Sequence, residues 1–282
     1  MTMPAAPRDL EDIELDLLLE ALHQRFGYDF GGYARASLRR RVQNLLIHTG
    51  VANISQLTER VLHGGVPITE VVDQLSVPVS EFFRDPPSFA TMLRLVFPLL
   101  ASYPHINVWQ AGCARGEEVY SLAILLEEAG LYERTRIWAT DISEKSLALA
   151  REGIYPAREL PQYADSYRLA GGRHSFSDYF HARYGHIKLD DALKRNVTFA
   201  PHNLAADGVF CETQLILCRN VLIYFQPPLQ QRALALFADS LVRGGFLCLG
   251  EKESMSRHEI RERFTLLDRR AALYRRNPSA HG

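Results

Sequence analysis

Two glycines and two glutamates stand close together in the stretch VWQAGCARGEEVYSLA, residues 108–123. A short apolar run, typical of a buried strand, ends at a loop with Gly112 and Gly116, and a helical pattern follows. Glycine in such a loop lets the backbone approach a ligand closely. Glu117 and Glu118 open the helix, where carboxylates would repel a pyrophosphate. They suit a cation instead, such as an α-ammonium group.

The spacing of these glycines disfavours two common nucleotide sites. It is GxxxG, whereas dinucleotide-binding turns carry GxGxxG, and no P-loop lysine follows. A nicotinamide-dependent oxidoreductase is therefore a poor explanation of this loop.

An acidic residue, Asp141, ends the next apolar run, RIWATD. A carboxylate at that position commonly accepts hydrogen bonds from ribose hydroxyls. A ligand with a ribose, an ammonium group and no phosphate describes S-adenosylmethionine. The simpler alternative is that Glu117 and Glu118 only cap one helix while Asp141 caps the next. The strand context of all three favours the cofactor.

Two asparagines, Asn203 and Asn220, also follow apolar runs. Asparagine at the end of a strand often only forms a turn. Its amide can also donate and accept hydrogen bonds, as the adenine edge or the methionine end of the cofactor requires. We predict that both bind the cofactor.

The elements that must position these residues differ along the chain. Residues 10–75 show helical spacing, as in Leu38, Val42, Leu45 and Leu46, with glycines between the segments. From residue 106, the runs INVWQA, RIWATD, LILCRN and GGFLCLG alternate with helical patterns, which predicts a parallel sheet covered by helices. LLDRRAALYRR could add a last antiparallel strand. Residues 158–197 are polar and aromatic without a clear helical period.

Composition narrows the class of protein. The 282 residues are 47% hydrophobic and 23% charged, with a formal net charge of −1, which does not suggest general nucleic-acid binding. The four cysteines form no CxxC pair and the histidines lack metal-ligand spacing, so neither zinc nor a disulfide framework is expected. The acidic N-terminus does not resemble a signal peptide, and no apolar run is long enough to span a bilayer. These features predict a cytoplasmic protein without membrane insertion.

Several motifs together resemble one known family. EFFRDPPSF, GCARGEEVYSLA, ATDIS, VTFAPHNL, ILCRNVLIYF and GGFLCLGEKES occur in the order found in chemotaxis receptor methyltransferases, the CheR family, and SLRRRV lies upstream. The resemblance covers nearly the whole chain, and FFRD followed by CRNVLIYF is its most specific part.

The resemblance implies an enzyme that methylates glutamate side chains on the cytoplasmic helices of chemoreceptors. The implied fold is α/β, a Rossmann-like S-adenosylmethionine-dependent methyltransferase sheet with a small N-terminal helical domain and an inserted β-subdomain. We predict a substrate-recognition domain at residues 1–75, a linker with the FFRD motif at 76–90 and a catalytic domain at 91–282, with the insertion at about 160–196. The implied product of the cofactor is S-adenosylhomocysteine.

The family's functional residues fall on positions of this sequence. Arg84 and Tyr224 are the implied catalytic pair. The implied cofactor contacts are Ser80, Arg84, Gly112, Glu118, Asp141, Ile142, Asn203, Leu204, Asn220 and Val221.

This chain departs from the family pattern at three places. Pro78 and Ser80 replace the usual Asn-x-Thr, GCARGEE replaces GCSTGEE so that Arg115 places a bulky cation beside the glycine loop, and GEKES replaces GHSES. Ser80 keeps a hydroxyl, but Pro78 offers no side-chain hydrogen bond. These changes motivate an alternative function, a signalling module that binds S-adenosylmethionine or S-adenosylhomocysteine with little turnover.

The chemistry of methyl transfer suits Arg84 and Tyr224. A glutamate has a reference pKa of about 4.3, so it is already ionised and needs orientation rather than a strong base. The planar guanidinium of Arg84 could orient that carboxylate, unless it forms a surface salt bridge with Asp85 or Glu81. The hydroxyl of Tyr224 could orient the carboxylate or the methyl donor, unless Tyr224 is an ordinary core aromatic.

The helix YARASLRRRVQNLL carries Arg39, Arg40 and Arg41 beside its apolar face. On a nearly neutral protein, a local basic surface predicts an acidic partner such as receptor methylation helices. A merely solvated helix face is the alternative, and nucleic acid fits less well because no aromatic residues are interleaved. The short segment HARYGHIKLDDALKRN suggests that no receptor tail peptide is needed. We expect a monomer.

Overall fold

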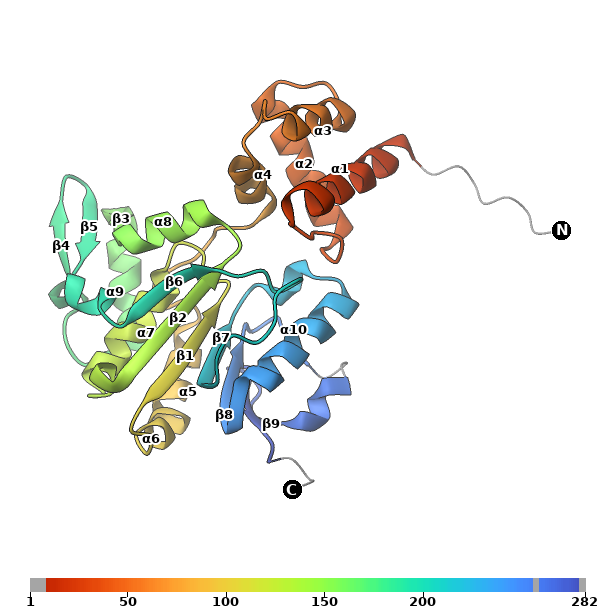
Figure 1. Cartoon of the computed structure of the whole chain (residues 1–282). Helices are drawn as coiled ribbons and strands as arrows, with labels where there is room; N and C mark the ends of the chain where they lie inside the picture. The colour runs from red at the N-terminus through yellow and green to blue at the C-terminus, as the bar shows by residue number, and fades with distance from the viewer. Residues whose placement is uncertain (1–8, 256–258, 279–282) are drawn as a thin grey trace. The chain divides into compact units, whose positions relative to one another are not determined.

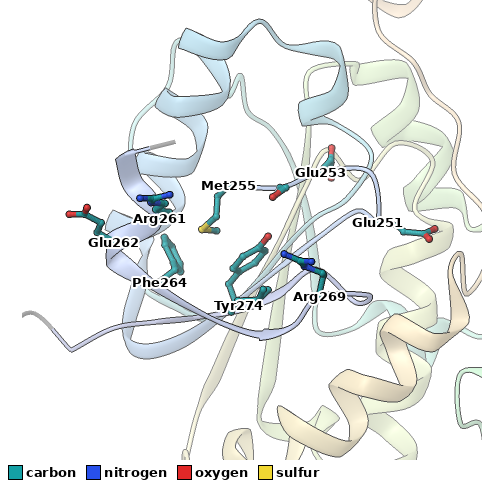
Figure 2. A pocket seen from close by; sticks show the side chains of 10 residues that line it. Glu251, Glu253, Met255, Arg261, Glu262, Phe264, Arg269 and Tyr274 are labelled. Atoms are coloured by element: carbon teal, nitrogen blue, oxygen red, sulfur yellow. The ribbon is translucent and has the colours of Figure 1, made fainter. Parts of the chain in front are cut away.

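The computed structural model describes residues 9–255 and 259–278 (Figure 1). It divides into two compact units. A helical unit contains the chain as far as Val77 together with Tyr224–Leu229, and a second unit contains Pro78–Ile223 and the chain from Gln230 onward. Among the described residues, no helix is both long and apolar enough to cross a membrane.

The helical unit is built from α1 (Leu10–Phe26), α2 (Arg35–Thr49), α3 (Ile54–Leu62) and α4 (Ile68–Leu75). Asn53 caps α3 by accepting a hydrogen bond from the Gln56 backbone N–H, as the preference for asparagine at helix starts predicts. The predicted apolar face of α2 is confirmed, because Leu38, Val42, Leu45 and Leu46 are all buried.

The inward face of α1 is formed by only some of its leucines. Leu10 and Leu17 are exposed, whereas Leu15, Leu18 and Leu22 are completely buried. Helical spacing at residues 10–18 therefore identifies the helix correctly but does not identify which stripe packs inward.

The second unit contains a seven-stranded sheet of order β6-β2-β1-β7-β8-β10-β9 (Figure 1). Its strands are β1 (Ile106–Ala111), β2 (Thr135–Asp141), β6 (Val197–Pro201), β7 (Thr213–Cys218), β8 (Leu241–Leu249), β9 (Phe264–Asp268) and β10 (Leu273–Arg276). The five strands from β6 to β8 in this order are parallel, as predicted. The C-terminal stretch supplies two antiparallel strands, β9 and β10, where the sequence suggested one.

Helices connect these strands and cover the sheet. They are α5 (Pro86–Leu95), α6 (Phe97–Leu100), α7 (Glu117–Glu128), α8 (Glu144–Glu152) and α10 (Pro227–Ser240). Ser143 caps α8 by accepting from the Ser146 N–H, and Gly153 ends that helix in the left-handed conformation. α5 begins at Pro86, so the end of the predicted 76–90 linker is helical.

A smaller antiparallel sheet of order β3-β5-β4 is formed by the chain segment between β2 and β6, and these two strands pair directly in the main sheet. It consists of β3 (Ile154–Pro156), β5 (His186–Leu189) and β4 (Phe180–Arg183), and α9 (Leu160–Leu169) lies between β3 and β4 in the chain (Figure 1). The sequence of this stretch shows no clear helical period, and yet the stretch contains α9. α9 buries only Tyr163 and Tyr167, so two aromatic residues one turn apart carry its whole inward face.

Candidate cofactor-binding site

The carboxyl ends of β1, β2, β6 and β7 meet at one edge of the sheet, because these strands are parallel. The neighbours of β1 are β2 on one side and β7 on the other, so the chain order reverses at β1. Ligands of open α/β sheets bind at such a reversal, outside the carboxyl ends of the strands. Most predicted cofactor residues of the second unit lie at or just after these strand ends, namely Gly112, Asp141, Ile142, Asn203, Leu204, Asn220 and Val221.

Gly112 leaves β1 with φ +71°, and its N–H donates to the Thr140 carbonyl at 2.8 Å. A Cβ atom at this position would lie 2.4 Å from Cγ2 of Val221, which follows β7. Two predicted cofactor residues from distant parts of the chain are thus in contact. Only glycine permits both this backbone conformation and this approach.

The carboxylate of Asp141 holds the glycine loop to the end of β2. Its Oδ2 accepts from the Ala114 N–H at 2.8 Å, and its Oδ1 accepts from the Ser143 N–H at 2.9 Å. Each carboxylate oxygen can accept more than one hydrogen bond, so hydroxyl groups of a ligand can still bind. Ile142 follows directly and is half-buried.

Asn203 stands near Asp141, since the neighbouring His202 N–H donates to the Asp141 carbonyl at 3.1 Å. The side-chain Oδ1 of Asn203 accepts from the Ala205 N–H at 2.9 Å, which is the turn that asparagine commonly makes. Its Nδ2 is buried and has no hydrogen-bond partner among the described residues. Leu204 is buried beside it.

Asn220 adopts a left-handed conformation, with φ +62°, directly after β7. Glu253 holds the backbone here. Its Oε2 accepts from the N–H groups of Asn220 at 2.9 Å and Gly250 at 2.7 Å, and its Oε1 accepts from the Ile223 N–H at 3.2 Å. Burial raises the pKa of Glu253, and these backbone donors oppose that shift. Glu253 therefore ties the loop after β7 to the loop after β8.

Glu118 is buried and already has partners. Its Oε2 lies 2.7 Å from Nη1 of Arg219, and its Oε1 accepts from Nε2 of Gln110 at 2.7 Å. Burial opposes the charge of Arg219, but Glu118 and the other carboxylates outweigh it and raise the pKa of the guanidinium. Glu118 thus has a structural role in an ion pair, and a ligand could contact it only in addition to these partners.

Arg219 also holds the FFRD turn. Its Nη1 donates to the Arg84 carbonyl at 3.0 Å, and its Nη2 lies 2.9 Å from Oδ2 of Asp85. Its guanidinium lies over the ring of Phe89, 5.3 Å from the centroid. One buried cation therefore connects the end of β7, the start of α7 and the turn before α5.

The FFRD turn places Arg84 between two residues of unusual conformation. Phe83 and Asp85 have φ of +53° and +51°, a region that is rare for a bulky phenylalanine and more often occupied by aspartate. The Phe83 N–H donates to Oγ of Ser121 at 2.8 Å, and its buried ring contacts Phe89. Such strain costs roughly 1–3 kcal/mol per residue and is concentrated at functional sites.

Arg84 itself is half-buried, and no carboxylate of the described chain lies within ion-pairing distance of its guanidinium. The alternative of a surface salt bridge with Asp85 is wrong, because Asp85 pairs with Arg219 instead. The turn therefore holds an unpaired cation in place.

Glu117 differs from its neighbour Glu118. It is 7% exposed, and its Oε2 has no hydrogen-bond partner among the described residues. Burial raises the pKa of this carboxyl to about 7, although Arg115 and a hydrogen bond from Ser80 partly offset the shift. The side chain of Ser80 is thus next to Glu117, while the side chain of Arg115 is exposed.

Unsatisfied buried atoms at this edge of the sheet match the needs of S-adenosylmethionine. Glu117 Oε2 and Asn220 Oδ1 are acceptors, Asn203 Nδ2 is a donor, and none has a partner among the described residues. Buried polar atoms normally have partners, so atoms of this kind indicate a ligand. The described residues contain no cluster of potential metal ligands.

The three arginines of α2 and Tyr224 belong to the helical unit. Arg40 is exposed, and the partly exposed Arg39 pairs with Asp12 of α1. The prediction that Arg41 lies on a basic surface is wrong. Arg41 is 7% exposed, and its guanidinium donates to the Leu75 carbonyl and lies over the ring of Tyr224.

Sequence reasoning missed Arg219, Gln110 and Glu253. A usable signal existed for Arg219, which stands directly after the buried strand LILC and before Asn220. A buried carboxylate such as Glu118 requires a buried cation. Glu253 gives no such signal, because its partners are backbone amides of distant loops.

Comparisons with known proteins agree with this geometry. Residues 78–271 match the family described as CheR methyltransferase, SAM binding domain, and residues 13–76 match CheR methyltransferase, all-alpha domain. A protein of Pseudomonas putida named "Putative methyltransferase Cher3" is 49% identical over 94% of this chain and 97% of its own length. A chemotaxis protein methyltransferase of Vibrio parahaemolyticus is 32% identical over 83% of this chain and 86% of its own length. The chain therefore belongs to the CheR methyltransferase family, and it is an S-adenosylmethionine-dependent methyltransferase.

Proposed function

We propose that this enzyme transfers the methyl group of S-adenosylmethionine to glutamate side chains on the cytoplasmic helices of chemoreceptors. The product is a γ-carboxyl methyl ester, formed in sensory adaptation in the cytoplasm. The similarity to proteins named chemotaxis protein methyltransferases supports this substrate. The observation that carries the proposal is Arg84, an unpaired guanidinium held by a strained turn beside the cofactor residues.

The residues at the sheet edge can divide the cofactor between them. Asp141 would accept hydrogen bonds from the ribose hydroxyls, and the free amide atoms of Asn203 and Asn220 would pair with polar groups at the two ends of the cofactor. Gly112 lets the backbone pass close to it. The remaining predicted contacts are Ser80, Ile142, Leu204 and Val221.

The ammonium group has two candidate acceptors, Glu117 and Glu118. Both oxygens of Glu118 already have protein partners, whereas Oε2 of Glu117 has none. A buried carboxylate without a partner is costly, and a ligand cation would remove that cost. We therefore assign the main contact with the ammonium to Glu117 and a supporting one to Glu118.

The chemical step is a displacement that needs no metal and no strong base. The cofactor supplies an electrophilic methyl group on a sulfonium. A carboxylate oxygen of the substrate forms the new bond to carbon while the carbon–sulfur bond breaks, leaving a neutral ester and a neutral thioether. Holding the reacting atoms in line can contribute roughly 7–11 kcal/mol in favourable cases. Arg84 orients the carboxylate, and Tyr224 contributes a hydroxyl that orients either reactant.

Recognition of the receptor is proposed to involve α2. Arg40 is exposed, and no carboxylate of the described residues pairs with it, so it can meet an acidic helix. Arg39 already pairs with Asp12, so it could contact a receptor only if it kept this ion pair as well or broke it. The basic surface offered to a receptor is therefore smaller than the run of three arginines suggests.

A labelling experiment tests the substrate. The purified enzyme is incubated with methyl-tritiated S-adenosylmethionine and cytoplasmic fragments of chemoreceptors. We expect label that mild base releases as methanol, which identifies an ester, and no such label on fragments with the methylated glutamates changed to alanine. Label that resists base would contradict esterification.

The alternative, a cofactor-binding module with little turnover, is tested in the same assay. Micromolar cofactor binding in a calorimeter without any base-labile label would favour it. Pro78 and Arg115 motivate this alternative; burial raises the pKa of Glu117, and the charge of the exposed Arg115 lowers it in part.

A further inference from the structure

Arg41 faces the interior of the helical unit, unlike the other arginines of α2. Its Nη2 donates to Oγ of Ser37 at 2.9 Å, and its Nη1 donates to the Leu75 carbonyl. The guanidinium carbon lies 4.9 Å from the centroid of the Tyr224 ring. Two hydrogen bonds therefore fix the plane of the cation that covers this ring.

The backbone around Tyr224 is held by the same unit. Its carbonyl accepts from the Ala34 N–H at 2.7 Å, and the Gln226 N–H donates to the Gly32 carbonyl at 2.7 Å. Between them, the rings of Phe225 and Tyr33 pack edge to face with centroids 4.8 Å apart. These contacts fix the backbone on both sides of Tyr224 and involve none of its side-chain atoms.

We propose that Arg41 is a positioning residue, which fixes the ring of Tyr224 in the conformation that methyl transfer requires. Cations over aromatic faces attract the ring most strongly when they are desolvated, as Arg41 is. The role is specific to arginine, because only a planar fork can reach Ser37 and Leu75 while it covers a ring. The inference rests on the proposed role of Tyr224 in turnover.

This assignment gives Arg41 a different role from that of its neighbours. A buried cation with two hydrogen bonds cannot also contact a receptor helix. The helical unit therefore acts on catalysis through Tyr224 as well as on substrate recognition through exposed residues.

Arg41→Lys tests the proposal in the full-length enzyme. We expect kcat for receptor methylation to fall at least tenfold, while the Kd for S-adenosylmethionine stays within twofold. Arg25→Lys is a matched control, because exposed Arg25 also lies over a ring of the helical unit, that of Phe26 at 5.8 Å. That control should keep the wild-type kcat. A wild-type kcat in Arg41→Lys would overturn the proposal.

A double-mutant cycle separates positioning from other effects. If Arg41 acts through Tyr224, then Arg41→Lys should lower kcat little further in a Tyr224→Ala background. Fully multiplicative losses would overturn the proposal, because they would show that Arg41 acts independently.

A spectroscopic measurement remains decisive if Tyr224 has no role in turnover. 3-Fluorotyrosine is placed at position 224, and its fluorine resonance is recorded in each variant. We expect Arg41→Lys to shift or broaden the resonance and Arg25→Lys to leave it unchanged. An unchanged resonance in Arg41→Lys would refute positioning. A changed resonance, with normal turnover in Tyr224→Phe, would instead refute the proposed role of the Tyr224 hydroxyl.

Discussion

The Glu118 carboxylate and the Arg219 guanidinium lie 2.7 Å apart, with side chains only 8% and 0% exposed. The two residues are separated by 101 positions in the chain. Their ion pair joins the first helix after the glycine loop to the end of β7, and Arg219 extends the connection to Asp85. A charged network thus organises the cofactor edge of the sheet.

Replacing Arg219 should lower the free energy of unfolding of the enzyme strongly. Arg219→Met leaves Glu118 buried without its cation, and breaking a buried pair in this way costs about 3–5 kcal/mol. Denaturant unfolding measures the loss. Arg195→Met is the control, because Arg195 forms an exposed pair with Glu133 and should lose less than about 1 kcal/mol. An equal decrease in the free energy of unfolding in the two variants would show that the buried pair stabilises the fold no more than the exposed pair does.

Glu117 should make the stability of the cofactor-free enzyme depend on pH. Its pKa in the folded state is raised to about 7 by burial, from an ordinary value of 4.5. The folded state therefore retains a proton that the unfolded state loses between these values. The free energy of unfolding should fall as pH rises from 4.5 to 7, by roughly 3 kcal/mol, and then level off. Glu117→Gln should remove this contribution.

Cofactor affinity should show the opposite trend with pH. An ammonium group beside Glu117 favours the ionised carboxylate, so binding should strengthen as pH rises from 6 to 8. Calorimetric titration in buffers of different ionisation enthalpy should detect release of a proton on binding. Glu117→Gln should bind more weakly and release none. Equal proton release by both proteins would exclude Glu117 as the acceptor.

The contact between Gly112 and Val221 should be essential for cofactor binding. Gly112→Ala adds a Cβ atom 2.4 Å from Val221, whereas Gly130→Ala, at φ +68°, meets no atom within 4 Å. Both variants carry the conformational cost of about 1–2 kcal/mol, but only Gly112→Ala should also shift the loop. Cofactor titration should show a large loss for Gly112→Ala and none for Gly130→Ala. Adding Val221→Ala to Gly112→Ala should restore part of the lost stability, measured by denaturant unfolding, because it removes the Cγ2 atom that the new Cβ would meet.

Asp141→Ala should weaken S-adenosylmethionine and S-adenosylhomocysteine binding to a similar extent, because the ribose is common to both. Loss of one charge-assisted hydrogen bond costs about 1.5–3 kcal/mol, so at least a tenfold weakening is expected. Asp191→Ala is a suitable control, because exposed Asp191 pairs with Lys194, three residues further along the chain. Unchanged binding in Asp141→Ala would place the ribose elsewhere.

The parallel sheet was predictable because its strands are short apolar runs bounded by turns, as in residues 106–111 and 135–141. The apolar face of α2 was predictable for a similar reason. The positions of Asp141 and Asn220 near the carboxyl ends of β2 and β7 were predictable in the same way. Each of these predictions used neighbouring residues in the chain.

Features that depend on distant residues were not predictable. Whether Arg41 lies outside or inside depends on Leu75 and Tyr224, which local periodicity does not include. The α9 helix packs Tyr163 against Phe82, with ring centroids 5.2 Å apart, so its burial follows from a partner about eighty positions earlier. The burial of Arg41 and of α9 depends on charged and aromatic partners that are distant in the sequence.

The helical unit contains six residues, Tyr224–Leu229, that are remote from its helices in the chain. During synthesis, α1 to α4 emerge first and can pack their leucines early. Their contacts with Tyr224, Phe225 and Gln226 can form only after most of the chain has left the ribosome. The N-terminal helices therefore lack these contacts until about the last fifth of the chain is being made. A fragment that ends near Val77 should be less stable than the same helices in the whole enzyme.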